Sequence, residues 1–414
     1  MPRTVRGEGV PVKCLILQHA IIVYGGLVSL IFRDRGKLSP RYIPERLPHR
    51  EKQLESLLSI YRPSLENVGG AFLQPVQLIG GVGAGKTCTA MRFGSILEAE
   101  ASRRRISLKH VYVNGRVDGA NRYTVYRRIL EEACPHVSSR GLSPEEMLVQ
   151  MVKQLRLEKK YVIITFDEVD HFIKRSNEHV VYDLTRLNEV SPGEPCNVLG
   201  VLFIARDPSY RSLLDPAEAS TLGLLSINFP QYNAQQIRDI IAERVDLAFK
   251  PGAVGEEVLD FVSDVAAKPP ANGDARFALD LLLYAGNLAE NMGCERVHPD
   301  HVRRVYGEIC PGISSAEVSS LSQNEKLILL GLARALKASR MPYASLRQIR
   351  EHYNVVCEEY GFKPTEKFEE NLQRLIDMGF VEMKSLTQIG LLVPAEHLDR
   401  FLSRMIVGSQ FHER

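Results

Sequence analysis

Short apolar runs alternate with helical patterns over residues 76–230. Each run is bounded by polar or turn-forming residues, which is typical of buried strands. Because the strands alternate with helices, the pattern predicts an α/β domain with a parallel sheet covered by helices on both faces. The predicted strands cover residues 76–79, 111–113, 162–166 and 198–204.

The strand pattern ends near residue 233, and helical patterns over residues 234–249, 255–267 and 275–292 predict a small helical domain. A segment rich in Pro, Gly and Ser follows and predicts a linker over residues 310–322. Ser322 and Glu325 have the spacing of a capping box at the start of a helix over residues 323–338. The predicted domains are residues 1–232 with an N-terminal extension, 233–310 and 318–414.

The third predicted domain has further helical patterns and then a hairpin pattern. The helices cover residues 345–360 and 365–378, and apolar runs at residues 381–383 and 389–393 flank a turn. Three helices followed by a β-hairpin are typical of a winged-helix domain.

Composition restricts the class of protein. A chain of 414 residues predicts about two or three domains. The net charge of +2 excludes a strong positive field over the whole molecule, so any basic surface must be local. The seven cysteines are scattered and never form a C-x-x-C pair, which argues against a disulfide framework or a zinc site and favours a reducing cytoplasm.

An apolar segment lies near the N-terminus, over residues 15–32, between Lys13 and Arg33. Its length is close to the minimum for a membrane-spanning helix. Polar residues such as Gln18 and His19 interrupt it, and no small-residue cleavage site follows. The sequence favours a packed strand or helix over a membrane anchor, and no membrane partner is expected.

A glycine-rich motif, G-x-x-x-x-G-K-[ST], follows the first predicted strand and opens a helix. Glycines allow backbone N–H groups to face phosphates, the lysine meets the β- and γ-phosphate oxygens, and the hydroxyl ligates Mg²⁺. The motif therefore predicts a P-loop that binds ATP or ADP with Mg²⁺. The predicted phosphate-binding residues are Gly80, Gly81, Val82, Gly83, Ala84, Gly85, Lys86, Thr87 and Cys88.

The third predicted strand delivers Asp167 and Glu168 to its carboxyl end. A Walker B site needs this pair: Asp167 to hold Mg²⁺ together with Thr87, and Glu168 to orient the attacking water.

Charge on the γ-phosphate also needs a cation. Arg276, at the start of a helix in the second domain, is the candidate, although a solvated helix arginine is the alternative. Arg206 faces either the phosphate or Asp207.

The order of these features resembles the archaeal origin-recognition and cell-division-cycle initiators, a family of AAA+ ATPases with a C-terminal winged-helix domain. The resemblance runs from about residue 38 to the C-terminus. It is carried by LSPRYIP at 38–44, LPHR at 47–50, YVN at 112–114, DEVD at 167–170 and FPQYNA at 229–234.

This resemblance implies an α/β AAA+ P-loop NTPase sheet, followed by a small helical lid and a winged-helix domain. It implies that Lys86, Asp167, Glu168 and Arg276 are catalytic, with Arg276 as the second sensor. It also implies that the segment from Tyr42 to Arg50 lines the adenine. The implied adenine contacts are Tyr42, Pro44, His49 and Arg50.

The resemblance further implies that duplex DNA is held by the winged helix and by a helical insertion after the second strand, over residues 115–128. Clustered arginines near tyrosines suit phosphate contacts, but an ordinary solvated helix fits the insertion equally well. The predicted DNA contacts are Arg116, Arg122, Arg127, Arg128, Lys363, Lys367, Arg374 and Lys384.

Two features depart from the family pattern. Arg206 stands where relatives commonly place an asparagine as first sensor, which predicts slow hydrolysis. In addition, acidic and basic residues are nearly balanced from residue 318 to the C-terminus, so the winged helix is not a uniformly basic reader. Residues 207–226, where an arginine that acts on a neighbouring subunit would be sought, contain Arg211 as their single arginine.

The sequence thus predicts a cytoplasmic, nucleoid-associated replication initiator that is switched by ATP binding and hydrolysis. Nucleotide state is expected to set the angle between lid and sheet. The expected partners are duplex origin DNA, the replicative helicase and paralogous initiators. The alternatives are another DNA-acting AAA+ ATPase, of a clamp-loader or transposition type, and a DNA-binding protein that keeps ATP as a structural cofactor.

Overall fold

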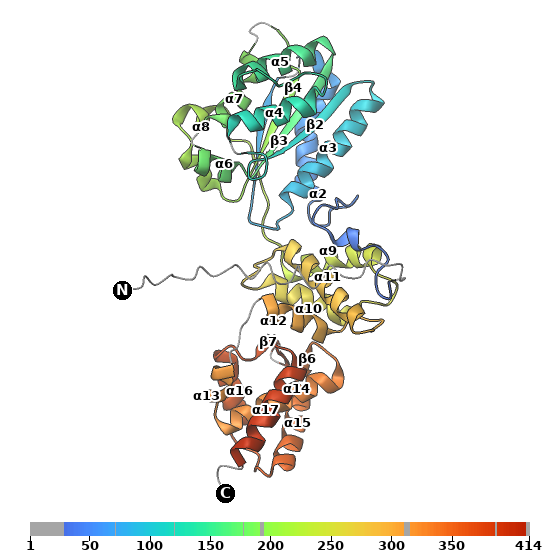
Figure 1. Ribbon diagram of the computed structural model, residues 1–414, viewed down its shortest axis with the longest axis vertical. Coiled ribbons are helices and arrows are strands. Elements are labelled where there is room, and N and C mark those ends of the chain that lie inside the picture. The colour runs from blue at the N-terminus through green and yellow to red at the C-terminus, as the bar shows by residue number, and fades with distance from the viewer. Residues whose placement is uncertain are drawn as a thin grey trace, which may run out of the picture.

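A computed structural model describes residues 29–410 except 71, 120, 177, 191–193, 310–314 and 386. Figure 1 shows three parts stacked along the long axis, with the helical lid between the sheet domain and the winged helix. Within the described residues, no helix is long and apolar enough to cross a membrane. Most of the apolar segment at residues 15–32 lies outside the described part of the chain.

The first part is a parallel sheet of strand order β2-β3-β4-β1-β5. The four predicted strands are present and the predicted fold class is confirmed. β5 was not predicted, because it has only three residues and no apolar run. The strands are β1 (Gln74–Ile79), β2 (Ser107–Asn114), β3 (Lys160–Asp167), β4 (Val198–Ala205) and β5 (Ser226–Asn228).

Alternate residues of the central strands enter two different cores. In β4, Val201 and Phe203 face one core while Leu202 and Ile204 face the other. Helices cover both faces, so both faces of the sheet are buried (Figure 1). One face holds α2 (Glu51–Glu66) and α3 (Lys86–Arg103); the other holds α4 (Arg122–Ala133), α5 (Pro144–Leu157), α6 (Val169–Ser176), α7 (Val180–Thr185) and α8 (Pro216–Leu222).

The lid packs around its own apolar core and includes residues from the start of the described chain. Ile31, Phe32 and Leu38 are buried among the lid helices, and the Phe32 ring lies 4.7 Å from that of Phe249. The described part of the chain therefore begins on the lid and then enters the sheet domain at α2. The lid helices are α9 (Ala234–Ala248), α10 (Glu256–Ala267), α11 (Ala275–Asn291) and α12 (Pro299–Ile309), of which α12 was not predicted.

The third part has the helices and hairpin of a winged helix. Its sheet has the order β6-β8-β7, and β6 and α17 were not predicted. The predicted linker is wrong over Ser315–Ser320, which forms the short helix α13. The other elements are α14 (Gln323–Ser339), β6 (Tyr343–Ser345), α15 (Leu346–Tyr360), α16 (Phe368–Asp377), β7 (Glu382–Ser385), β8 (Gln388–Gly390) and α17 (Ala395–Gln410).

Polar contacts fix the winged helix to the lid. Arg303 of α12 is 2% exposed and donates to the carbonyl oxygens of Leu391 (3.0 Å) and Pro342 (2.7 Å). Asp264 of α10 accepts from the Tyr343 hydroxyl at 2.9 Å and pairs with Lys384 of β7 at 2.8 Å. The wing of this domain consequently rests on the lid.

Candidate nucleotide site

The P-loop connects β1 to α3 in a conformation that requires glycine. Gly83 and Gly85 have φ angles of 69° and 87°, and Gly85 caps α3 in the left-handed region. A Cβ on Gly83 would lie 1.7 Å from Asp274 Oδ1, at the N-cap of the lid helix α11. The loop therefore touches the lid directly at its tip.

Lys86 begins α3, and its ammonium is held inside the loop. Its Nζ donates to the carbonyl oxygens of Gly80 (2.5 Å) and Gly81 (2.7 Å), and the residue is 9% exposed. Burial lowers the pKa of Lys86, and the Asp167 carboxylate acts in the opposite direction. A buried cation at this end of the sheet favours an anionic ligand.

Asp167 ends β3 and lies at the centre of a hydrogen-bond cluster. Its Oδ2 accepts from the hydroxyls of Thr87 (2.6 Å) and Tyr112 (2.8 Å), and its Oδ1 accepts from the backbone N–H of Glu168 (2.8 Å). Burial raises the pKa of Asp167, while these hydrogen bonds lower it. A carboxylate paired with a threonine hydroxyl is an oxygen donor set that suits Mg²⁺.

Two arginines flank Glu168. The carboxylate lies 3.5 Å from Arg206 Nη2 and 3.9 Å from Arg116 Nη1. Arg206 therefore does not pair with Asp207, whose side chain accepts from the Ser209 N–H instead. Arg206 thus reaches the residue predicted to orient water.

A cavity of about 810 Å³ extends from the P-loop to the lid. His49, predicted to contact the nucleotide, is absent from its lining and bonds Asp239 at 2.8 Å. Gly80 and Gly81 are likewise absent from the lining. The predicted residues that do line it are Tyr42, Pro44, Arg50, Val82, Gly83, Ala84, Gly85, Lys86, Thr87, Cys88, Arg116, Asp167, Glu168, Arg206 and Arg276.

Arg50 binds the backbone of the P-loop. It is 2% exposed, and its guanidinium donates to the carbonyl oxygens of Ala84 (2.8 Å) and Pro230 (2.5 Å). Its Cζ lies 3.9 Å from the centre of the Tyr232 ring. Its bonds go to backbone carbonyls, so Arg50 orders the loop and the chain segment that leads into the lid.

Sequence reasoning missed Arg244 of α9, which lines the same cavity. It donates to the Lys37 (2.8 Å) and Tyr42 (3.2 Å) carbonyls and lies over the Tyr42 ring at 4.8 Å. One signal was available: Arg244 shares the buried face of α9 with Ile237 and Ile241, where a charged residue needs a partner.

Arg276 enters the cavity from the first turn of α11 and is exposed. Its backbone N–H donates to Asp274 Oδ1 at 2.8 Å, so the residue that caps α11 is also the one that contacts Gly83. The lid therefore presents a cation to the space in front of the P-loop.

Comparisons with known proteins agree with this architecture. Residues 74–214 match an AAA domain, residues 238–307 the Cdc6 AAA+ ATPase-type lid domain, and residues 316–390 the CDC6 C-terminal winged helix domain. ORC1-type DNA replication protein 1 of Aeropyrum pernix is 35% identical over 341 residues, covering 81% of this chain and 83% of the relative. The chain belongs to the ORC1-type DNA replication protein family.

Solved structures of the ORC1/Cdc6 kind have the same fold. Cdc6p of Pyrobaculum aerophilum superposes with a TM-score of 0.77 at 28% identity, covering 92% of this chain and 99% of that one. The Aeropyrum pernix ORC1 protein in complex with DNA superposes with a TM-score of 0.61 at 32% identity, covering 93% of this chain and 100% of that one.

In this ORC1-type chain, the predicted DNA contacts do not gather at one place. Arg116 lies in the nucleotide cavity, and the others lie on α4 or in the winged helix, with the lid between (Figure 1). Most have a carboxylate partner: Arg122–Glu145 at 2.7 Å, Arg127–Glu131 at 3.9 Å, Arg128–Glu132 at 2.5 Å, Lys367–Glu370 at 3.6 Å, Arg374–Glu325 at 3.5 Å and Lys384–Asp264 at 2.8 Å. Lys363 is exposed ahead of α16.

Proposed function

We propose that this protein is an ATP-dependent replication initiator that binds duplex origin DNA and takes part in recruiting the replicative helicase. The observation that carries the proposal is a P-loop and Walker B cluster facing a lid that bears a winged helix, in a chain of the ORC1-type family. A related ORC1 protein solved in complex with DNA supports DNA as the ligand. Family membership supports paralogous initiators as further partners.

We propose a task for each residue of the nucleotide site from its position. Lys86 and Arg276 would hold phosphate oxygens from the loop and the lid, and Glu168 would orient the attacking water. Thr87 and Asp167 would hold Mg²⁺, which supplies positive charge to the phosphates when bound. Because the lid contacts the loop at Gly83, the presence of a γ-phosphate is expected to change the position of the lid.

Hydrolysis is proposed to be slow. Arg206 and Arg116 both lie within 4 Å of the Glu168 carboxylate, and these ion pairs restrain the side chain that would orient the attacking water. ATP binding would then outlast a single encounter with DNA and serve as a switch.

Binding of genomic DNA fragments, measured with ATP and with ADP, tests the proposal. We expect protection of discrete duplex sites that differs between the two nucleotides. Lys86→Ala should lose tight ATP binding with its fold intact, because the change removes a phosphate-facing charge at the first residue of α3 and leaves the apolar cores unchanged. Its DNA protection should then no longer differ between ATP and ADP. Absence of duplex binding by the wild type at low salt would rule out the initiator function.

A second candidate is a DNA-binding protein that keeps ATP as a structural cofactor. The observation in its favour is the placement of both Glu168 oxygens beside guanidinium groups. Single-turnover hydrolysis, compared with nucleotide retention after purification, separates the two. Complete retention without turnover would favour the structural cofactor.

A further inference from the structure

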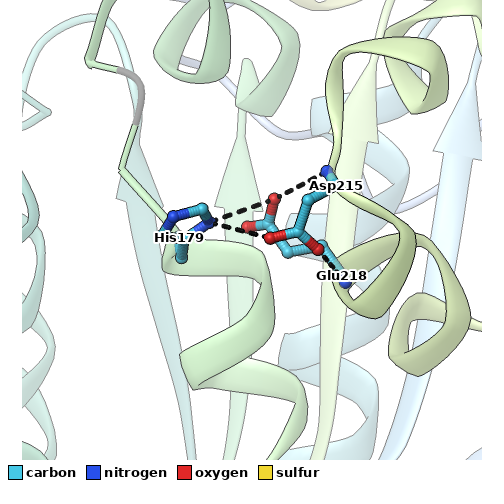
Figure 2. A group of neighbouring side chains, drawn as sticks. All are labelled: His179, Asp215 and Glu218. Carbon is cyan, nitrogen blue, oxygen red and sulfur yellow. Dashed lines mark hydrogen bonds and ion pairs between the residues drawn. The ribbon is translucent and has the colours of Figure 1, made fainter.

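Three side chains that can bind a metal meet beside the N-termini of α7 and α8 (Figure 2). His179 precedes α7, Asp215 is the N-cap of α8, and Glu218 lies in the first turn of α8. One ligand atom from each lies within 4.8 Å of the other two. Figure 2 shows both carboxylates directed toward the imidazole. None of the three belongs to the lining of the nucleotide cavity.

The spacing of these atoms suits a small divalent ion. His179 Nδ1 lies 3.2 Å from Asp215 Oδ2 and 3.5 Å from Glu218 Oε2. In a tetrahedral site with metal–ligand bonds of about 2.0–2.1 Å, neighbouring ligand atoms are about 3.3–3.4 Å apart. Two of the three ligand separations are therefore already close to those of a tetrahedral site.

Glu218 provides an independent indication of a ligand. The residue is only 5% exposed, yet its Oε1 has no hydrogen-bond partner among the described residues. Its other oxygen accepts a long hydrogen bond of 3.3 Å from the Asp215 N–H. A buried carboxylate oxygen without a partner is costly, and a metal ion next to it would remove that cost.

The elements that carry the ligands are held in place without the ion. Asp215 and Glu218 form the capping box of α8, in which Glu218 N donates to Asp215 Oδ1 at 2.7 Å. A hydrogen bond of 2.9 Å between the hydroxyls of Thr185 and Thr221 joins α7 to α8. The three ligands are thus arranged in advance of binding.

We propose that His179, Asp215 and Glu218 form a binding site for a divalent transition-metal ion, with Zn²⁺ as the model ion. One imidazole nitrogen with two carboxylates is a donor set for this class, whereas Mg²⁺ and Ca²⁺ prefer oxygen alone. The His179 side chain is 63% exposed, which leaves water access for a fourth ligand. A bound ion links the N-terminus of α7 to that of α8, and α8 directly follows the segment that carries Arg211.

Equilibrium dialysis of the nucleotide-free full chain against Zn²⁺ tests the site. Glu218→Gln and Asp215→Asn remove a charge but keep residues that can serve in a capping box, so α8 should remain folded. We expect Zn²⁺ binding at this one site to be at least tenfold weaker in His179→Ala and in Glu218→Gln than in the wild type. Zn²⁺ should raise the melting temperature of the wild type and not of these variants.

His136→Ala is the matched control. His136 also pairs with a glutamate, Glu158, at 2.7 Å and is similarly exposed, but the described structure places only one carboxylate beside it. This variant should bind Zn²⁺ like the wild type. With Co²⁺, the extra site should show a visible spectrum without thiolate charge-transfer bands, which excludes the cysteines as ligands. Wild-type Zn²⁺ binding in Glu218→Gln and His179→Ala would overturn the proposal.

Discussion

Arg206 contacts Glu168 at 3.5 Å and also lines the nucleotide cavity, so it can act either on the Glu168 carboxylate or on the nucleotide. We expect Arg206→Asn to raise single-turnover ATP hydrolysis by up to roughly fivefold, since an exposed ion pair that restrains the base is worth up to about 1 kcal/mol. Rapid-quench measurements with saturating ATP give the rate.

Glu168→Gln is the reference for this experiment. It keeps the shape of the side chain and should retain ATP while stopping turnover. The double variant should be as inactive as Glu168→Gln. A fall in the rate of Arg206→Asn to the Glu168→Gln level would instead show that Arg206 stabilises charge in the transition state.

Residues of the P-loop and Walker B site could be predicted because local motifs specify them. The glycines are required by positive φ angles and by contact with Asp274, and Asp167 must follow a buried strand. Arg244 and Tyr232 could not be predicted in this way. They reach the site through packing between the lid and the N-terminal segment, which no short motif encodes.

Helix α4 carries three of the arginines that the sequence assigned to DNA. Arg122, Arg127 and Arg128 each pair with a carboxylate, yet exposed pairs are weak and a DNA phosphate can replace the partner. We expect the triple change to Ala to weaken duplex binding about equally on all sequences. It should flatten the slope of log affinity against log salt by about two to three units.

Fluorescence anisotropy at several salt concentrations measures that slope. Arg400→Ala is the control, because Arg400 has the same i, i+4 pairing, with Glu396, on α17. An unchanged slope in the triple variant would make α4 an ordinary solvated helix.

Strand β2 contains a partly buried histidine that makes the sheet domain sensitive to acid. His110 bonds Thr165 Oγ1 through Nε2 at 2.8 Å, and burial lowers the pKa of His110 to about 4. An unfolded histidine has a pKa of about 6.5. Between these values the unfolded state binds more protons, so the free energy of unfolding should fall by up to about 1.4 kcal/mol per pH unit as the pH drops.

Hydrogen exchange of the β2 and β3 amides, corrected for intrinsic rates, measures this change. His110→Gln should remove most of the slope between pH 6.5 and 4, whereas a change at the exposed His136 should leave it intact. An equal slope in wild type and His110→Gln would assign the acid sensitivity to other groups.

Most long elements with sustained apolar spacing were predicted, although the helices α12 and α17 were missed, and the short strands β5 and β6 were not predicted. Helices with sustained apolar spacing, such as α9 and α14, and the apolar strands of the sheet were identified from sequence. β5 and β6 have three residues each and exist because neighbouring strands pair with them. The helix α13 formed within a stretch whose composition favours a linker.

At the scale of the whole molecule, Arg303 fixes the position of the winged helix on the lid. Its replacement by Met would leave the carbonyls of Leu391 and Pro342 without their donor in a buried interface. We expect a loss of about 2–4 kcal/mol in the stability of the docked arrangement. Limited proteolysis between the lid and α14 should become faster.

Arg304→Met on the same helix is the matched control, because Arg304 is less buried and its Nη1 contacts the Met292 sulfur at 3.4 Å. It should be cleaved at the wild-type rate. Equal cleavage of wild type and Arg303→Met would show that the apolar contacts of this interface are sufficient to hold it.

Over residues 29–410, as far as they are described, the chain passes between the lid and the sheet domain twice: once between Leu38 and α2, and again after β5. Arg50 bonds the carbonyls of Ala84 and Pro230, so both passages lie beside each other at the P-loop. Two adjacent connections define one axis for rotation of the lid against the sheet domain. They restrict rotation about other axes, which a single connecting segment would allow. Because the winged helix is docked on the lid, it moves together with the lid about this axis whenever the lid rotates.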